Sequence, residues 1–331
     1  MKYVVVVQDS ALFNNLYRDL LKIDNVSSYY VDKYKTNDLK NKFKRIHTSL
    51  LINSYIDMPC KYVYYSELFN YVDDDTCYIF SHASATKVGK RILHRLKQSG
   101  RNVHLVLLLI DSFNAHTVTL FRAWRAIKKI QWDLILSYDI EDCKKYGFTY
   151  LGYTYYSRKN GIIPSGNESD IYFVGENKPG DNRYDLVSGV FKYLNTAKIK
   201  ARFIVVDSFK KHVSCNTEQL IFKEKYIPYD DVLSDVLSSN CILEILQEGQ
   251  QQQSARYFEA ICYNKKLLTN NPHIVELPFY DSRYMKYFSK PDDIDVEWVK
   301  RKENIDYNYR GEFSSAKIIE QIEKIGIDSG W

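Results

Sequence analysis

The chain has 331 residues, of which 45% are hydrophobic and 26% are charged, and its formal net charge is +5. This length fits two domains of about 150 residues, each large enough to bury a core of its own. No apolar run reaches the roughly 18 residues of a membrane-spanning helix, and the first residues turn polar too soon for a signal peptide.

The charge is unevenly distributed along the chain. Residues 1–160 hold 24 basic and 15 acidic residues, whereas the remainder holds 22 and 26, so the two halves suit different partners. Six scattered cysteines form no C-x-x-C pair and no cluster with histidine at metal spacing. We therefore expect no bound metal and a cytoplasmic location. The modest net charge and the lack of a DNA- or RNA-binding motif argue against nucleic acid as a partner.

Strands and helices are predicted to alternate along the first half. In chain order we expect a buried strand over 3–7, a helix marked by Leu12, Leu16 and Leu20, weaker strands over 50–56 and 62–65, a strand over 76–81, a helix from Val88 to Leu96 closed by Gly100, the most apolar strand over 103–110, a helix around Trp124 and a strand over 133–137. Such alternation is typical of βαβ units in a parallel, doubly wound sheet.

The same alternation restarts in the second half. Residues 157–169 are rich in Gly, Pro, Ser and Asn and predict a linker between domains. After them we expect strands over 171–174, 202–206, 241–246 and 266–269, helices over 185–194 and 229–238, and a last helix over 314–327. Neither half has G-x-G-x-x-G after its first strand, and there is no Walker loop, which argues against a dinucleotide redox cofactor.

The most informative stretch follows the strand at 241–246. A polar loop containing Gln250 opens a helix with Ser254 near its start, followed by Arg256 and Glu259. Helix N-termini bind anions because free backbone N–H groups and the positive end of the dipole point outward there. We therefore interpret Arg256 as a phosphate ligand and Glu259 as a ligand for ribose hydroxyls. Gln250 and Ser254 suit both helix capping and phosphate binding, which use the same backbone geometry.

This stretch resembles the donor-binding loop and helix of GT-B glycosyltransferases, most closely bacterial enzymes that build capsule, exopolysaccharide and lipopolysaccharide. The matching positions are Glu244, Ile245, Gly249, Gln250, Arg256, Glu259, Ala260, Lys265, Lys266, Leu267, Thr269 and Asn270. Gln251 stands eight residues before Glu259, where many retaining GT-B enzymes have a second glutamate. The pattern therefore leaves inversion and retention both open.

The resemblance implies the fold and the domain plan. We expect an α/β protein of the GT-B class, with two Rossmann-like domains facing a cleft. Residues 1–160 would form the acceptor- and membrane-facing domain and residues 161–311 the donor-binding domain. Residues 312–331 would form a helix that crosses back to the first domain. The related enzymes also have a basic element after the first strand of the second domain, which assigns Lys178 and Arg183 to the donor diphosphate.

The implied function is that of a hexosyltransferase. It would move a sugar from a UDP-, GDP- or dTDP-linked donor to a lipid-linked saccharide in bacterial surface polysaccharide assembly, without metal or other cofactor. The alternatives are a non-catalytic GT-B scaffold or partner subunit, and a nucleotide-sugar epimerase. Transfer with inversion needs a base near the acceptor hydroxyl. The candidates follow strands of the first domain, and we rank them Asp111, His82, Asp9.

Two helices of the first half carry basic residues opposite their apolar faces. They include Arg91, Arg95, Arg122 and Arg125. One interpretation is a solvated helix face. The other is docking on anionic lipid headgroups, which a lipid-linked acceptor would require, at the inner face of the cell membrane. The element around Asp139 also resembles the related enzymes, and we interpret Asp139 as a helix N-cap and Tyr146 as a packing anchor.

Overall fold

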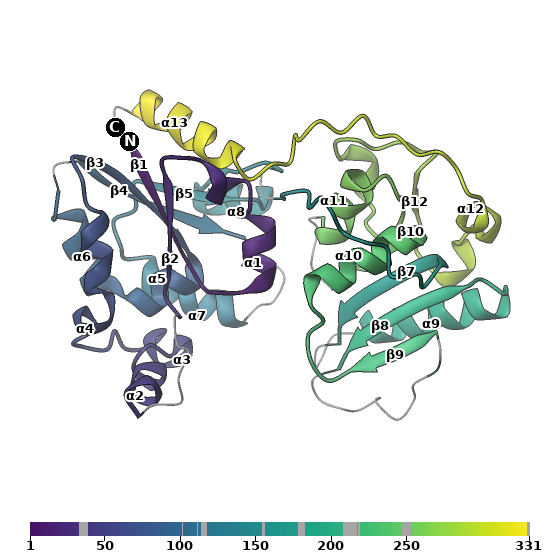
Figure 1. Ribbon diagram of the computed structural model, residues 1–331, viewed down its shortest axis with the longest axis horizontal. Helices are drawn as coiled ribbons and strands as arrows, with labels where there is room; N and C mark the ends of the chain where they lie inside the picture. The colour runs from purple at the N-terminus through teal and green to yellow at the C-terminus, as the bar shows by residue number, and fades with distance from the viewer. Residues whose placement is uncertain are drawn as a thin grey trace. The chain divides into compact units, whose positions relative to one another are not determined.

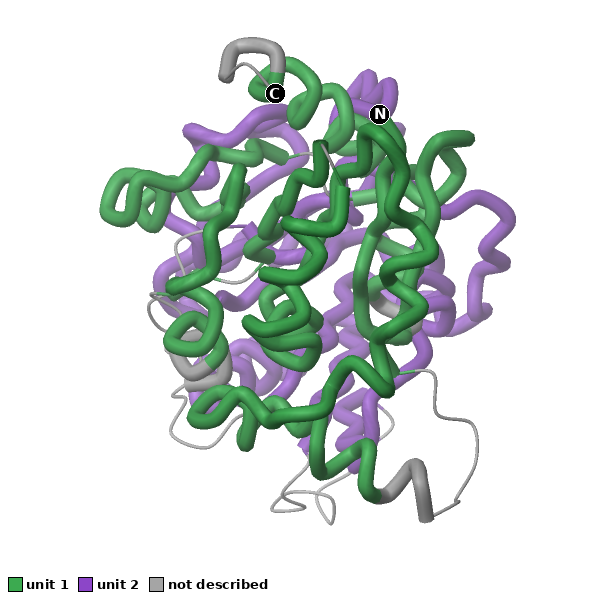
Figure 2. The backbone as a smooth tube through the Cα atoms, turned by 90° about the vertical axis from the view of Figure 1, so that its left-hand side faces the viewer, with its two compact units in different colours: residues 1–157, 313–331 green, residues 158–312 purple. Residues whose placement is uncertain are grey.

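The computed structural model describes residues 1–32, 39–100, 102–110, 112–113, 118–153, 156–177, 183–207, 217, 219–246 and 253–329, without the side chains of 11–12, 39–42, 118–122 and 327–329. The chain forms two compact units, shown in Figure 2. Unit 1 comprises Met1–Ser157 with Phe313–Trp331, and unit 2 comprises Arg158–Glu312. Within the described ranges, no helix is long and apolar enough to cross a bilayer.

Unit 1 is built on a six-stranded parallel sheet with the strand order β2-β1-β3-β4-β5-β6 (Figure 1). Its strands are β1 (Lys2–Val7), β2 (Val26–Tyr30), β3 (Asp75–Ser81), β4 (Asn102–Leu109), β5 (Leu134–Ser137) and β6 (Thr149–Tyr150). Its helices are α1 (Ala11–Leu16), η1 (Leu20–Lys22), α2 (Leu39–His47), α3 (Leu50–Asn53), α4 (Tyr62–Tyr65), η2 (Ser66–Tyr71), α5 (His82–Val88), α6 (Lys90–Lys97), α7 (Val118–Ile127), α8 (Ile140–Tyr146) and α13 (Lys317–Ser329).

Both faces of this sheet are covered by helices. Because side chains alternate along a strand, Val4 and Val6 of β1 face one layer and Val5 and Val7 face the other. The first layer contains α5, α6 and the end of α7. The second contains α1, η1 and α13 (Figure 1). Burial on both faces explains why β1 and most of β4 are apolar in sequence.

The segment after unit 2 completes the core of unit 1. Ile318 and Ile322 of α13 are fully buried and pack in the same cluster as Val5, Cys77 and Leu108. The return of the chain is fixed by hydrogen bonds: the Ser315 hydroxyl accepts from the Leu20 N–H at 3.1 Å.

Unit 2 is a second six-stranded parallel sheet, with the order β12-β11-β10-β7-β8-β9. Its strands are β7 (Ser169–Glu176), β8 (Ala201–Val206), β9 (Leu220–Lys223), β10 (Ser239–Glu244), β11 (Lys266–Thr269) and β12 (Met285–Tyr287). Its helices are α9 (Arg183–Thr196), α10 (Tyr229–Ser238), α11 (Ala255–Cys262), η5 (Ile274–Glu276), η6 (Pro291–Asp293) and α12 (Val296–Lys300). Helices α9 and α12 pack on one face, while α10 and α11 contact β7, β10 and β11 through other residues.

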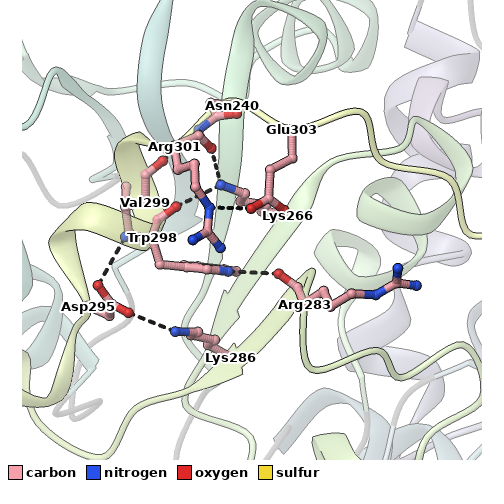
Figure 3. A network of polar contacts seen from close by, with 9 residues as sticks. All are labelled: Asn240, Lys266, Arg283, Lys286, Asp295, Trp298, Val299, Arg301 and Glu303. Carbon is pink, nitrogen blue, oxygen red and sulfur yellow. Dashed lines mark hydrogen bonds and ion pairs between the residues drawn. The ribbon is translucent and has the colours of Figure 1, made fainter.

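A buried lysine joins β11 to α12, as Figure 3 shows. The Lys266 ammonium is fully buried, donates to the carbonyls of Trp298 (2.7 Å) and Arg301, and lies 5.1 Å from the centre of the Trp298 ring. A cation at a helix C-terminus satisfies carbonyls that have no partner within the helix. The Trp298 indole N–H donates to the Arg283 carbonyl at 2.8 Å and so extends the network to the loop before β12.

Two of the predicted strands are wrong. Residues 50–56 and 62–65 instead contain the short helices α3 and α4. Short apolar runs do not distinguish strand from helix by periodicity alone. Buried Tyr65 and Leu68 lie three residues apart, a spacing that turns both toward the core only in a helical backbone. The helix predicted from Val88 is also divided, because Gly89 has a φ of +87° between α5 and α6.

We expect Ile322→Ala to destabilise unit 1 by about 2–5 kcal/mol, because it leaves a cavity in a closed core. Hydrogen-exchange mass spectrometry should show lost protection in β1 and β3 but not in unit 2. Glu320→Ala, on the exposed side of the same helix, is the control and should change stability by less than about 0.5 kcal/mol. Equal effects of the two substitutions would contradict the packing described for α13.

Candidate functional site

Glu244 ends β10 and is buried. Its Oε1 accepts from the Ser254 N–H (2.9 Å) and the Ser254 hydroxyl (2.7 Å), and its Oε2 accepts from the Thr269 hydroxyl (2.6 Å). One carboxylate thus connects the end of β10, the end of β11 and the start of α11. Ser254 is also the N-cap of α11, as predicted, because its hydroxyl accepts from the Arg256 N–H at 3.1 Å.

The other flank of residues 247–252 is fixed by an asparagine. The Asn270 side-chain oxygen accepts from the Leu246 N–H at 2.7 Å. Leu246 before this segment and Ser254 after it are therefore held by side chains from the same edge of the sheet, Asn270 and Glu244. Residues 247–252, including the predicted ligand Gln250, lie outside the described residues.

Arg256 and Glu259 lie together on α11. The Arg256 Nη2 is 2.8 Å from Glu259 Oε1, and the Tyr229 hydroxyl donates to the same oxygen at 2.7 Å. Glu259 is 0% exposed, whereas Arg256 keeps 12% of its side chain accessible. Of this pair, Arg256 is therefore the residue whose side chain is accessible. Oε2 of Glu259 has no hydrogen-bond partner among the described residues.

Burial raises the pKa of both Glu244 and Glu259. Desolvation raises the pKa of Glu244, against hydrogen bonds from Thr269 and Ser254 that lower it. Desolvation also raises the pKa of Glu259, while the Arg256 charge and the Tyr229 hydrogen bond oppose the shift and the Glu244 charge adds to it. The negative charge of Glu244 therefore makes ionisation of Glu259 less favourable.

Two candidate residues here were missed by the sequence analysis. Gln253 is 1% exposed, and neither polar atom of its amide has a hydrogen-bond partner in the described part of the chain. A buried amide without partners is uncommon and indicates a site where a ligand or water completes the bonding. Tyr229 was missed because it lies 30 residues before its partner Glu259. Only the glutamine run drew attention to Gln253, and composition does not identify which glutamine is buried.

The helix after the first strand of unit 2 supplies a second cation. Arg183 begins α9, and its guanidinium lies 5.5 Å from the centre of the Phe173 ring. A side chain at Gly175 would meet Arg183 Nη2 at 2.8 Å, so glycine is what allows this close approach. Lys178, predicted to act beside Arg183, lies outside the described residues.

The helices that carry Arg183 and Arg256 follow two strands between which the strand order reverses. From β7 the chain continues through β8 to β9 on one side and through β10 to β12 on the other. β7 and β10 pair in parallel, with Tyr172 opposite Ile242, so their carboxyl ends share one edge of the sheet. The starts of α9 and α11 follow those two ends. In open α/β sheets this switch point is where ligands bind.

Unit 1 has the corresponding switch point between β1 and β3, which pair with Val6 opposite Phe80. Asp9 follows β1, is exposed and accepts from the Asn14 amide at 3.2 Å. His82 follows β3 directly as the first residue of α5 and is 7% exposed. Two of the three predicted base candidates thus flank the reversal. Asp111 follows the next strand, β4, and lies outside the described residues.

The basic helices carry their predicted residues at the surface. Arg91 and Arg95 of α6 and Arg125 of α7 are exposed. Arg122 belongs to α7, and its side chain lies outside the described part.

Asp139 is confirmed as the N-cap of α8, since it accepts from the Glu141 and Asp142 N–H groups at 2.9 and 3.0 Å. Among the described residues, no group of three or more His, Cys, Asp and Glu is placed to hold a metal ion.

The raised pKa of Glu244 makes a prediction about pH. Because the pKa of Glu244 is higher in the folded state, protonation of this acid stabilises the fold. That contribution to the unfolding free energy is fully present below the ordinary pKa of 4.5 and is lost as pH rises through the folded-state pKa. Glu244→Gln keeps an acceptor for Ser254 but does not ionise. We expect the unfolding free energy of the wild type to fall relative to this variant from about pH 4 to pH 8. Urea unfolding across this range measures it, with exposed Glu297→Gln as control. Parallel pH profiles for wild type and Glu244→Gln would contradict the assignment.

Comparison with known proteins gives the fold. No protein-family model and no curated protein matches the sequence. Similar solved structures include an alpha-glucosyltransferase in complex with UDP, with 12% identity, a TM-score of 0.58, and coverage of 98% of this chain and 99% of that chain. The MnaA–UDP co-structure from S. aureus has 12% identity, a TM-score of 0.54, and coverage of 100% and 97%. The UDP-N-acetylglucosamine 2-epimerase from Rickettsia bellii has 11% identity, a TM-score of 0.51, and coverage of 99% and 96%. Two six-stranded parallel sheets with helices match these structures over the full length, and the chain therefore has the GT-B fold.

Proposed function

We propose that the protein is a glycosyltransferase that binds a nucleotide-sugar donor at the switch point of unit 2. The observation that carries this proposal is that Arg183 at the start of α9 and Arg256 at the start of α11 follow the carboxyl ends of the neighbouring strands β7 and β10. Cations and helix N-termini at one edge suit a diphosphate. The UDP found with an alpha-glucosyltransferase and with MnaA, which share the fold, is consistent with such a ligand.

Within this site each residue has a distinct proposed role. Arg256, Arg183 and Lys178 would neutralise the diphosphate, with Ser254 and Gln250 presenting the start of α11. Glu259, buried under Tyr229, would hold the Arg256 guanidinium in place. For Glu259 to bind the ribose hydroxyls as well, its buried Oε2 would have to become accessible when the donor binds. Gln253 would complete its amide hydrogen bonds on the ligand. Because fixed cations and a helix dipole stabilise a leaving diphosphate, this chemistry needs no metal.

We place the acceptor in unit 1. Its switch point brings Asp9 and His82 to the ends of adjacent strands, and Asp111 follows β4. This placement favours Asp9 and His82 over Asp111 as the base that takes the acceptor proton. The acceptor we propose is a lipid-linked saccharide of bacterial surface polysaccharide assembly. Exposed Arg91, Arg95 and Arg125, together with Arg122, would hold unit 1 at an anionic membrane.

A nucleotide-sugar epimerase is the second candidate, because a UDP-N-acetylglucosamine 2-epimerase shares the fold over 99% of this chain. Incubation with a panel of UDP-, GDP- and dTDP-sugars, with and without acceptor, separates the candidates. A transferase consumes donor in step with glycosylated acceptor. An epimerase converts the nucleotide sugar without acceptor, and a scaffold binds without turnover. Conversion in the absence of acceptor, or no turnover with any acceptor, would count against transfer.

Removing the accessible cation should weaken nucleotide binding. We expect Arg256→Ala to reduce the affinity for UDP, or for the diphosphate that binds best, by about 1.5–3 kcal/mol in calorimetry, because charge-assisted hydrogen bonds are lost. Arg202→Ala is a matched control. It also deprives a buried carboxylate, Asp235, of its guanidinium partner (3.0 Å), but near the amino end of β8. Equal losses in both variants would trace the effect to general destabilisation.

The base candidates make a kinetic prediction. Replacing the base should lower turnover about a hundredfold and leave the donor affinity unchanged, because the group acts on the acceptor proton. We expect this for Asp9→Asn or His82→Gln, with circular dichroism confirming the fold of the buried His82 variant. Asp111→Asn completes the set. Wild-type turnover in all three would refute a single inverting base in unit 1.

A further inference from the structure

Large apolar side chains are exposed together in residues 43–63 of unit 1. Phe43 and Ile46 lie three residues apart on α2, with Phe43 70% exposed, and Val63 of α4 is 77% exposed. The full set is Phe43, Ile46, Leu51, Tyr55, Ile56, Tyr62 and Val63. Exposed large apolar residues elsewhere in the described chain, such as Ile163 and Val275, stand singly. Seven in twenty-one consecutive residues need an explanation that scattered ones do not.

These helices are joined to the basic helices. α3 contacts α2, α5 and α7, and Figure 1 shows α2 beside α3. The Arg125 guanidinium lies 5.9 Å from the centre of the Tyr55 ring, and that of Arg95 lies 5.8 Å from the centre of the Tyr62 ring. The Arg91 N–H donates to Asp57 at 3.1 Å. Tyr55 and Tyr62 therefore lie against the guanidinium groups of Arg125 and Arg95. We call the exposed apolar residues of 43–63 together with Arg91, Arg95 and Arg125 the apolar–basic surface.

We propose that the apolar–basic surface inserts into the interfacial layer of an anionic lipid bilayer. Aliphatic and phenylalanine side chains would enter the acyl boundary, tyrosines would lie at headgroup depth, and the arginines would contact lipid phosphates. This goes beyond electrostatic docking, because the contact would include buried apolar area that salt does not screen. It does not depend on which sugar chemistry the protein performs.

The charges favour a bilayer over a second copy of the chain. A symmetric dimer through this surface would bring Arg91, Arg95 and Arg125 of one copy toward the same residues of the other. The neighbouring acid Asp57 already pairs with Lys61 at 2.8 Å. Like charges at such an interface are repulsive, whereas an anionic bilayer supplies an apolar layer and negative charge together.

Sedimentation of the full chain with vesicles tests the proposal. We expect binding to phosphatidylcholine–phosphatidylglycerol vesicles with a fraction that resists high salt. Replacing Phe43, Ile46, Ile56 and Val63 by serine should lower the affinity at least about tenfold and remove that fraction. The matched control is Ile163→Ser with Val275→Ser, which removes apolar residues 79% and 57% exposed in unit 2 and should change nothing. Complete release of the wild type by salt, or equal losses in both variants, would overturn insertion.

A second measurement does not depend on weakening the protein. Val63→Trp should be quenched by brominated lipid on anionic vesicles, and Ile163→Trp should not, because only the first site would lie in the interface. Equal quenching of the two would overturn the assignment. Sedimentation velocity without lipid addresses the dimer. A wild-type dimer that becomes monomeric in the four-serine variant would show that a second copy, and not lipid, covers the surface.

Discussion

The hydrogen bonds to the Glu244 carboxylate hold together the carboxyl edge of the second sheet. It receives three hydrogen bonds, and these come from two different elements, the start of α11 and the end of β11. An ionised carboxylate only accepts, so it matches a helix start, where backbone N–H groups lack partners. Burial raises its pKa, because desolvation disfavours the ionised form. This cost accompanies the geometry that the three hydrogen bonds impose. The position of Arg256 follows from that geometry, because Arg256 lies one turn or less from Ser254.

Much of the motif that resembles a donor-binding element is structural. Asn270 and Glu244 fix the two flanks of residues 247–252. Lys265 donates to the carbonyls of Leu237 and Ser239, at 2.8 and 2.6 Å, and Lys266 donates to carbonyls at the end of α12 (Figure 3). A pattern of polar residues around a loop is therefore compatible with two tasks at once. Some residues hold the backbone, and Arg256 and Gln253 are the residues that we propose for the ligand.

The sequence predicted the parts of the fold that depend on local pattern. Apolar runs such as 3–7 and 103–110 are buried central strands, and their alternation with helices predicted parallel, doubly wound sheets. The GT-B class was predicted from the resemblance of the stretch around Arg256 and Glu259 to donor-binding elements. It failed where the pattern is short: residues 50–56 and 62–65 are in helical segments, and β12 has only three residues. In the candidate site, Ser254 was predicted as N-cap from its type and position. The full burial of Glu259 was not predicted, because it depends on tertiary packing around α11, which also brings Tyr229 to its carboxylate.

Unit 2 is inserted into unit 1, since the chain leaves at Ser157 and returns at Phe313. During synthesis the ribosome therefore makes all of Arg158–Glu312 before it makes α13. Domains fold largely as units while the chain emerges, so unit 2 has every residue it needs while the layer of unit 1 that contains Val5 and Leu108 still lacks α13. A nascent chain would expose that apolar face for the time that about 155 residues take to translate, which makes it a natural contact for a ribosome-associated chaperone.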